Sequence, residues 1–253
     1  MSDSCLVLRL AGPLQSWGSS SQFNRRETDD RPTKSGVIGL LAAAQGRRRS
    51  DPIEDLVDVK LAVRVDQPGS LLRDYHTVSD LLGRPLLSAS TSAQGRQKST
   101  SKMTHVTTRF YIQDAVFVAA VRGERDFLNT LVSAIRRPSF PLALGRRACV
   151  PTMPLLLTPE DGDLWPGGLA DVIRSVPWQA SPHWRNRQGG SAALAVTSDS
   201  AEGNDVVADV PVSFEPGRRG MRTRRVVHEW VHVGAASADG RPVEHDPFAA
   251  LGW

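Results

Sequence analysis

The residues best suited to binding a polyanion are Gly145-Arg146-Arg147, a glycine followed by two adjacent arginines. Glycine lets the backbone approach a partner without a Cβ in the way, and arginine offers planar, permanently charged donors that match phosphate oxygens. The surrounding segment, Phe127 to Pro159, contains no acidic residue. The motif predicts a phosphate contact, although paired arginines beside a glycine also occur on ordinary solvated surfaces.

A second group suited to anions is Thr33-Lys34-Ser35, which combines hydroxyls and a lysine at the start of a predicted helix. The free backbone amides of a helix N-terminus bind anions readily. The pattern is not a P-loop, because G-x-x-x-x-G-K-[ST] is absent. An ordinary N-cap followed by a solvated lysine is the alternative interpretation.

Tyr75 and His76, with Lys98 and Lys102 downstream, are the residues from which a metal-independent ribonuclease would be built. A histidine or tyrosine would act on the 2′-hydroxyl while a lysine stabilises the developing phosphate charge. The alternative is that Tyr75 and His76 only stack on RNA or hydrogen-bond to it. Which of these holds depends on whether the groups converge in space.

His228-Glu229-Trp230-Val231-His232 matches the H-E-x-x-H pattern of zinc proteases, which requires a helix. The surrounding residues are β-branched and alternate with period two, which predicts a strand. Positions four apart in a strand stand roughly 13 Å from each other, too far to share one zinc ion. We therefore expect no metal site and no cofactor.

The chain has 253 residues and a net charge of +4, with its charges strongly segregated. Three runs lack acidic residues and are rich in arginine or lysine, namely 81–113, 127–159 and 216–228. Such segregation is typical of polyanion binders. The chain has two cysteines, no apolar run near the ~20 residues of a membrane span, and no evident signal peptide. These features predict a cytoplasmic protein without a membrane partner.

Periodicity predicts a ferredoxin-like α+β sandwich with an arm inserted before its second helix. The 57–65 strand alternates, so that Arg64 is expected on a solvated face. The polar segment 88–108 has too little apolar material to join a core. The expected elements are strand 5–10, helix 35–45 capped by Thr33 or Ser35 and ended at Gly46, strand 57–65, strand 109–121, helix 124–137, strands 206–214 and 224–233, and a tail over 234–253.

Four ordered motifs carry a resemblance to a known family. They are Leu8-Arg9-Leu10-Ala11-Gly12-Pro13-Leu14-Gln15-Ser16-Trp17-Gly18, Pro32-Thr33-Lys34-Ser35-Gly36-Val37-Ile38-Gly39-Leu40-Leu41, Leu72-Arg73-Asp74-Tyr75-His76-Thr77 and Leu144-Gly145-Arg146-Arg147-Ala148-Cys149. Together they resemble the CasD family of the RAMP superfamily, the type I-E Cascade subunits that cap the 5′ handle of CRISPR RNA. The similarity runs from residue 5 to about 157 and is weaker over 206–233.

The resemblance implies a ferredoxin-like (RRM-like) RAMP body over residues 1–80 and 109–233, with additional C-terminal strands. It also implies an inserted β-hairpin thumb over 81–108 and a C-terminal tail over 234–253. The implied function is that of a noncatalytic Cascade subunit in antiviral defence. Its partners would be the CRISPR RNA 5′ handle, the backbone, large and small subunits, and target DNA indirectly. In related type I-C systems the equivalent subunit is the processing nuclease, which keeps a repeat endoribonuclease using Tyr75, His76 and Lys98 or Lys102 as the alternative.

We expect RNA contacts at the helix start, the glycine loop, the segment after the first strand, and the thumb with its base, and we assign no catalytic residue. Phosphate contacts are expected at the helix start and the glycine loop, and base contact or stacking at Gln15 and Trp17. A buried or interface position is an equal alternative for Trp17, and Arg9 is expected to be structural. The complete set is Gln15, Trp17, Thr33, Lys34, Ser35, His76, Lys98, Lys102, Arg109, Gly145, Arg146 and Arg147.

Overall fold

The computed structural model describes residues 3–18, 25–79 and 104–234. The helices are α1 (Lys34–Ala44), α2 (Glu54–Val57), α3 (Arg125–Arg136), α4 (Leu169–Ser175) and α5 (Pro182–Arg187). The strands are β1 (Ser4–Gln15), β2 (Arg25–Arg26), β3 (Lys60–Gln67), β4 (Ser70–Ser79), β5 (Thr104–Arg122), β6 (Trp165–Pro166), β7 (Ser191–Asp199), β8 (Asp205–Ser213) and β9 (Gly220–Gly234).

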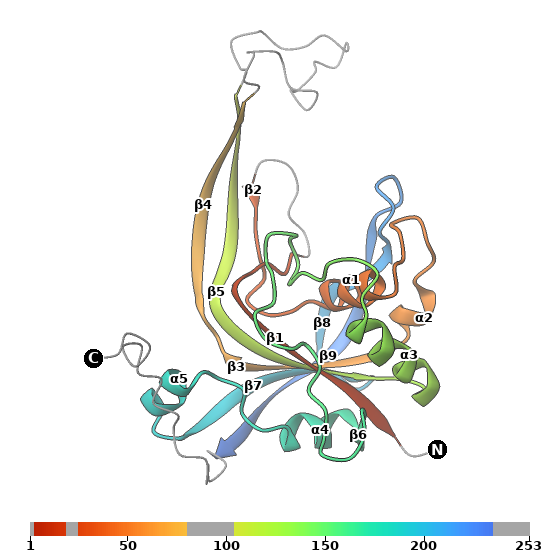
Figure 1. The fold of residues 1–253 in the computed structure, drawn as a ribbon, viewed down its shortest axis with the longest axis vertical. Helices are drawn as coiled ribbons and strands as arrows, with labels where there is room; N and C mark the ends of the chain where they lie inside the picture. Colours follow the sequence, from red (N-terminus) through yellow and green to blue (C-terminus); the bar gives the residue numbers. More distant parts are fainter. Residues whose placement is uncertain (1–2, 19–24, 80–103, 235–253) are drawn as a thin grey trace, which may run out of the picture.

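All nine strands of the described residues belong to one mixed sheet, which is almost entirely antiparallel (Figure 1). The main path runs β6-β1-β5-β3-β7-β9-β8. The long strand β5 pairs over its second half with β1 and β3, and over its first half with β4 and β2. The first half of β5 and its partner β4 therefore form an arm that projects from the body.

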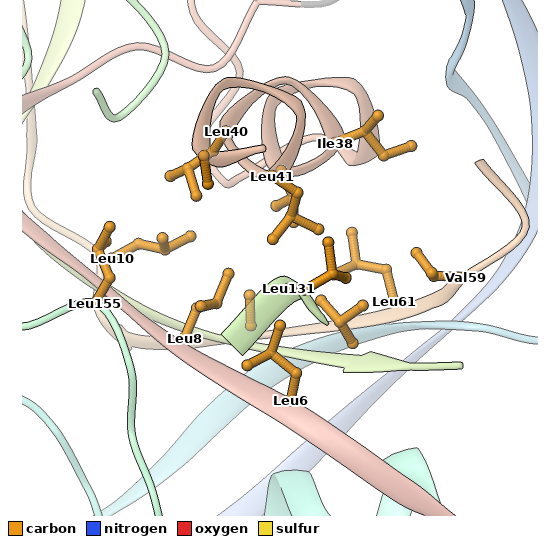
Figure 2. Packing of buried hydrophobic residues seen from close by; sticks show 14 of the residues in the cluster. Leu6, Leu8, Leu10, Ile38, Leu40, Leu41, Val59, Leu61, Leu131 and Leu155 are labelled. Atoms are coloured by element: carbon orange, nitrogen blue, oxygen red, sulfur yellow. The ribbon is translucent and has the colours of Figure 1, made fainter. Parts of the chain in front are cut away.

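Leucines on one face of the sheet pack against α1 and α3 (Figure 2). Leu6, Leu8 and Leu10 alternate along β1 and are fully buried beneath Leu41 and Leu131 of the two helices. Thr33 caps α1 by accepting from Gly36 N, and Gly46 adopts φ +80° just after the helix. Both helix ends follow the sequence signals. This layer is the larger of two hydrophobic clusters.

The opposite face of the sheet is covered by α4 and the chain that follows it. Cys5, Ala62 and Val118 are completely buried there against Ile173 and Trp178. Strand β3 is therefore buried on both faces. The prediction that one face of this strand is solvated is wrong, because the helix that covers it lies in a segment with no clear sequence signal.

The predicted elements of residues 5–137 are present with small boundary shifts. Helix and strand positions at 35–45, 109–121 and 124–137 are confirmed by α1, β5 and α3. The strand expected at 57–65 begins at Lys60, because residues 54–57 form α2. Several features were not predicted: the short helices and strands α2, α4, α5, β2 and β6, the strands β4 and β7, the continuation of β1 to Gln15 and the extension of β5 back to Thr104. Among the described residues, no helix is long and apolar enough to cross a lipid bilayer.

Arg64 and Asp66 form an ion pair that is fully buried at the centre of the second layer. Arg64 Nε lies 2.7 Å from Asp66 Oδ1, and both side chains are 0% exposed. Arg64 also donates to the carbonyl oxygens of Ile173, Val176 and Pro177 at 2.6–3.1 Å. Burial raises the pKa of Asp66, and the neighbouring Arg64 opposes that effect. A guanidinium that satisfies one carbonyl in the last turn of α4 and two just after the helix explains why a charge is tolerated here.

Replacing Arg64 with Met is expected to lower the free energy of unfolding by about 3–5 kcal/mol, because Asp66 stays buried without its partner. Urea denaturation monitored by circular dichroism measures the loss. Arg174→Met is the control, since the Arg174–Glu229 pair is exposed and should contribute at most about 1 kcal/mol. Equal losses in the two variants would contradict the structural role of Arg64.

Candidate nucleic-acid interface

The arm is a two-stranded ribbon whose side chains alternate between two faces. Strands β4 and β5 pair continuously from Ser70 opposite Gln113 to Ser79 opposite Thr104. Residues directly opposite each other in such a pair lie on the same face. The register therefore assigns each side chain of the arm to one face or the other.

One face of the arm, near its base, carries two arginines and two aromatic residues. Arg73 lies opposite Phe110, and Tyr75 lies opposite Thr108. Arg25 of β2 joins this face, with its guanidinium 5.0 Å from the centre of the Phe110 ring. We call this surface the arginine–aromatic face, made up of Arg25, Arg73, Tyr75, Val106, Thr108 and Phe110.

The arginine–aromatic face is open and hollowed. Its residues, apart from Tyr75, line a depression of about 410 Å³. The Tyr75 side chain is 65% exposed, and Arg25 and Arg73 are also exposed. Exposed aromatic rings stack on unpaired bases, and nearby arginines bind the phosphates between them. These residues are therefore suited to bind single-stranded nucleic acid.

The opposite face of the arm carries Asp74 and His76. His76 Nδ1 lies 3.5 Å from Asp74 Oδ2, and Arg109 is half-buried opposite Asp74 in the register. Since neighbouring strand residues point to opposite faces, Tyr75 and His76 do not converge on one phosphate. The other two residues of the ribonuclease hypothesis, Lys98 and Lys102, lie outside the described residues.

The glycine loop is locked against the segment that follows β1. Gly145 adopts φ +92°, and a Cβ at this position would lie 1.7 Å from the Ser16 carbonyl oxygen. Ser16 N donates to Leu144 O at 3.0 Å. Contact with the protein's own backbone therefore requires a glycine at position 145, whether or not a ligand binds there.

Arg146 is half-buried and bonds to the protein's own backbone. Its guanidinium donates to the carbonyl oxygens of Phe110, Arg26 and Glu27 at 2.8–3.1 Å and lies 4.7 Å from the centre of the Tyr111 ring. Arg146 therefore holds β2 against β5 and positions Arg25. Because the Arg146 side chain is only half-buried, its predicted phosphate contact stays a prediction. Arg147 is exposed, so an RNA contact from it stays a prediction.

Gly145→Ala is expected to destabilise the fold by more than the roughly 0.4–1 kcal/mol typical of glycine effects, since it adds a backbone clash to positive-φ strain. Gly162→Ala is a matched control, because Gly162 has φ +91° and nothing within 4 Å of an added Cβ. The difference between the melting temperatures of the two variants measures the effect of the clash with Ser16 alone. Similar melting temperatures for the two would show that the loop yields easily.

Gln15 and Trp17 are buried and make internal hydrogen bonds. The Gln15 amide donates to Leu10 O at 3.0 Å and Ala115 O at 2.7 Å, and accepts from Trp17 Nε1 at 3.0 Å. Both side chains are 0% exposed. The prediction of base contact or stacking is therefore wrong for these two residues, and the alternative of a core position holds for Trp17.

The start of α1 is also occupied from within the protein. Thr33, Lys34 and Ser35 are at most 6% exposed. Lys34 Nζ donates to Val59 O at 2.7 Å and Asp199 Oδ2 at 3.1 Å, and Lys34 N donates to Asp209 Oδ2 at 2.8 Å. The carboxylates of Asp199 and Asp209 therefore occupy the position that was predicted for a phosphate. The prediction that Thr33, Lys34 and Ser35 contact phosphate is wrong, because these residues are buried.

Arg224 completes a four-residue ionic network with these carboxylates. It binds both oxygens of Asp209 at 2.6 and 2.8 Å and also bonds to Asp199. Burial lowers the pKa of Lys34, and Asp199 opposes that shift. Acidic residues of segment 199–209 thus pair with Arg224 of the basic run 216–228. This pairing could not be predicted, because the two segments are separate in the sequence.

His228 and His232 lie on strand β9, as predicted. His228 bonds to Thr197 Oγ1 at 2.9 Å and Asp205 Oδ2 at 3.0 Å. Within the described part of the chain, no three His, Cys, Asp or Glu side chains are grouped so that they could hold a metal ion. Cys5 and Cys149 are free and buried, and burial raises the pKa of the Cys5 thiol to about 11.

Sequence reasoning missed Arg25, Arg73 and Phe110 as members of one surface. The alternation Leu71, Arg73, Tyr75 was the available signal, because it is the pattern of one strand face. Arg25 could not be added from sequence, since it reaches this face only through the pairing of β2 with β5.

Comparisons of the sequence and of the structure with known proteins identify the same family. A family model described as CRISPR-associated protein (Cas_Cas5) matches residues 5–227. The CRISPR system Cascade subunit CasD of Escherichia coli (strain K12) is 36% identical over 168 residues, covering 61% of this chain and 70% of that protein.

Two solved structures are similar over almost the whole chain. A chain of a CRISPR RNA-guided surveillance complex aligns with a TM-score of 0.73 and 35% identity, covering 91% of both chains. A crystal structure of a Cas protein aligns with a TM-score of 0.65 and 32% identity, covering 90% of this chain and 94% of the other. The chain therefore belongs to the CRISPR-associated protein family Cas_Cas5.

Proposed function

We propose that this chain is a noncatalytic subunit of a type I-E CRISPR surveillance complex and binds the 5′ handle of CRISPR RNA. The observation that carries the proposal is the arginine–aromatic face, where Tyr75 and Phe110 offer rings to bases and Arg25 and Arg73 offer charge to phosphates. Membership of the family and the likeness to a subunit of a guided complex support RNA as the ligand.

The proposed partners are CRISPR RNA, the backbone, large and small subunits of the complex and, through the complex, target DNA. The proposed location is the cytoplasm. The pairing of β4 with β5 supports the proposed thumb, which would reach the guide beside a backbone subunit. The proposed division is a body of residues 1–80 and 109–233, a thumb of 81–108 and a tail of 234–253.

The sheet order supports a ferredoxin-like body as a finer description of the fold. Strands β6, β1, β5 and β3 are adjacent in that order, and α1 and α3 both cover one face. This is the arrangement expected when two strand–helix–strand units share one antiparallel sheet. Strands β7, β8 and β9 would then be a family-specific extension.

Replacing both Arg25 and Arg73 with Ala should weaken binding of a synthetic 5′-handle RNA and reduce its salt dependence. Each lost phosphate contact on a single strand lowers the log–log slope by roughly 0.7. Fluorescence anisotropy between about 50 and 200 mM salt measures the slope. The control is Arg48→Ala with Arg49→Ala, two exposed arginines after α1. An unchanged slope in the first variant would remove these arginines from the interface.

Tyr75→Ala should weaken handle binding by about 1–3 kcal/mol through loss of one stacked base, at an unchanged salt slope. Tyr75→Phe keeps the ring and should bind like the unmodified protein. The same titration measures both variants. A large loss in the Phe variant would assign the effect to the hydroxyl group instead of stacking.

For the noncatalytic assignment, the purified chain is expected to leave a repeat RNA intact in EDTA. The separation of Tyr75 and His76 onto opposite faces supports this expectation. Gel analysis of end-labelled RNA is the measurement. Cleavage at one site that His76→Ala abolishes would establish the ribonuclease alternative.

A further inference from the structure

A second concave surface lies between β6 and the C-terminal end of α4. It is a groove of about 580 Å³, within the range of roughly 300–1,000 Å³ that is typical of ligand sites. Apolar side chains of Leu157, Trp165 and Val176 and three prolines form most of its lining. We call it the Trp165 groove, lined by Leu157, Thr158, Pro159, Glu160, Asp161, Trp165, Pro166, Ser175, Val176, Pro177 and Gln179.

The Trp165 groove is separate from the arginine–aromatic face. The two surfaces share no residue, and β6 and α4 lie at the opposite end of the molecule from the projecting arm (Figure 1). Nucleic acid bound at the arginine–aromatic face therefore does not account for this groove.

The walls of the groove are held in place by buried hydrogen bonds. Arg64 binds the carbonyl oxygens of Val176 and Pro177, and Asp66 Oδ2 accepts from Gln179 N at 2.6 Å. On the other wall, Trp165 Nε1 donates to Leu157 O at 2.7 Å. A groove shaped before its ligand arrives loses less conformational entropy on binding.

The rim of the groove is acidic, although the chain as a whole carries a net charge of +4. Glu160 and Asp161 are exposed, and within the described ranges neither forms an ion pair with a basic side chain. The nearby Asp163 differs, because it pairs with Arg136. Unneutralised carboxylates repel a nucleic-acid backbone and attract lysine or arginine.

We propose that the Trp165 groove binds a basic segment of another protein subunit of the same complex. An apolar side chain of that segment would pack against Trp165, and a lysine or arginine beside it would pair with Glu160 and Asp161. Apolar contact at the centre with charge pairs at the rim is the usual composition of a protein interface. This inference rests on the proposed function only in taking the partner from the complex.

The test uses the tagged full-length chain, coexpressed with CRISPR RNA and the other subunits of its own complex. Glu160→Lys with Asp161→Lys should reduce the retained amount of one protein subunit by roughly tenfold or more, because like charges then face each other. RNA per chain should not change. Quantitative mass spectrometry and RNA extraction give the two readouts, and Asp58→Lys with Glu202→Lys is the charge-matched control at exposed sites outside the groove.

Ser175→Trp, which fills the groove from an exposed position, is the second variant and should cause the same loss. Retention of every subunit at unmodified ratios in both variants would overturn the proposal, as would self-association of the isolated chain that the charge reversal abolishes. Loss of a subunit without loss of RNA supports it. Absence of RNA from the unmodified complex would contradict the proposed function. The amount of each retained subunit would still show whether the Trp165 groove binds a protein partner.

Discussion

The structure depends on one strand, β5, which is hydrogen-bonded along its whole length to different partners. Its second half lies between β1 and β3 in the centre of the sheet, and its first half pairs with β4 to form the arm. Because the register continues from the core into the arm, the packing of the core also fixes which arm side chains share a face. Arg73, Tyr75 and Phe110 meet for this reason, and His76 is excluded for the same reason.

Charged residues in this protein have two separate roles, and the burial of each residue shows which role it has. Lys34 and Arg224 are paired with Asp199 and Asp209 inside the body, and Arg64 is paired with Asp66. These groups join α1 to the C-terminal strands and α4 to β3. Arg25 and Arg73 remain exposed at the surface, where Arg25 pairs with the likewise exposed Glu27 and can exchange that partner for a ligand. The buried pairs specify the arrangement of layers, and the surface arginines specify the chemistry of the proposed interface.

Sequence reasoning succeeded where one local pattern determines one local structure. The apolar stripe and Thr33 cap of α1, the end of α3 and the strand character of β9 follow directly from periodicity. It failed for the site, because a lysine at a helix start has the same local pattern whether it meets phosphate or Asp199. Gly145 and Arg146 show the same limit, since their partners Ser16 and Phe110 are distant in sequence. The helix-start motif makes internal bonds, whereas Arg73 and Tyr75 of the third family motif lie on the exposed arginine–aromatic face.

The arginine–aromatic face, and not the helix start, is the proposed main RNA site. Ultraviolet crosslinking of the complex to a photoreactive 5′-handle RNA, followed by peptide mass spectrometry, tests this assignment most directly. RNA bound at this face should crosslink to peptides that contain Tyr75 and Phe110, and not to the peptide that contains Lys34. Crosslinks concentrated on residues 32–41 with none on β4 or β5 would contradict the assignment.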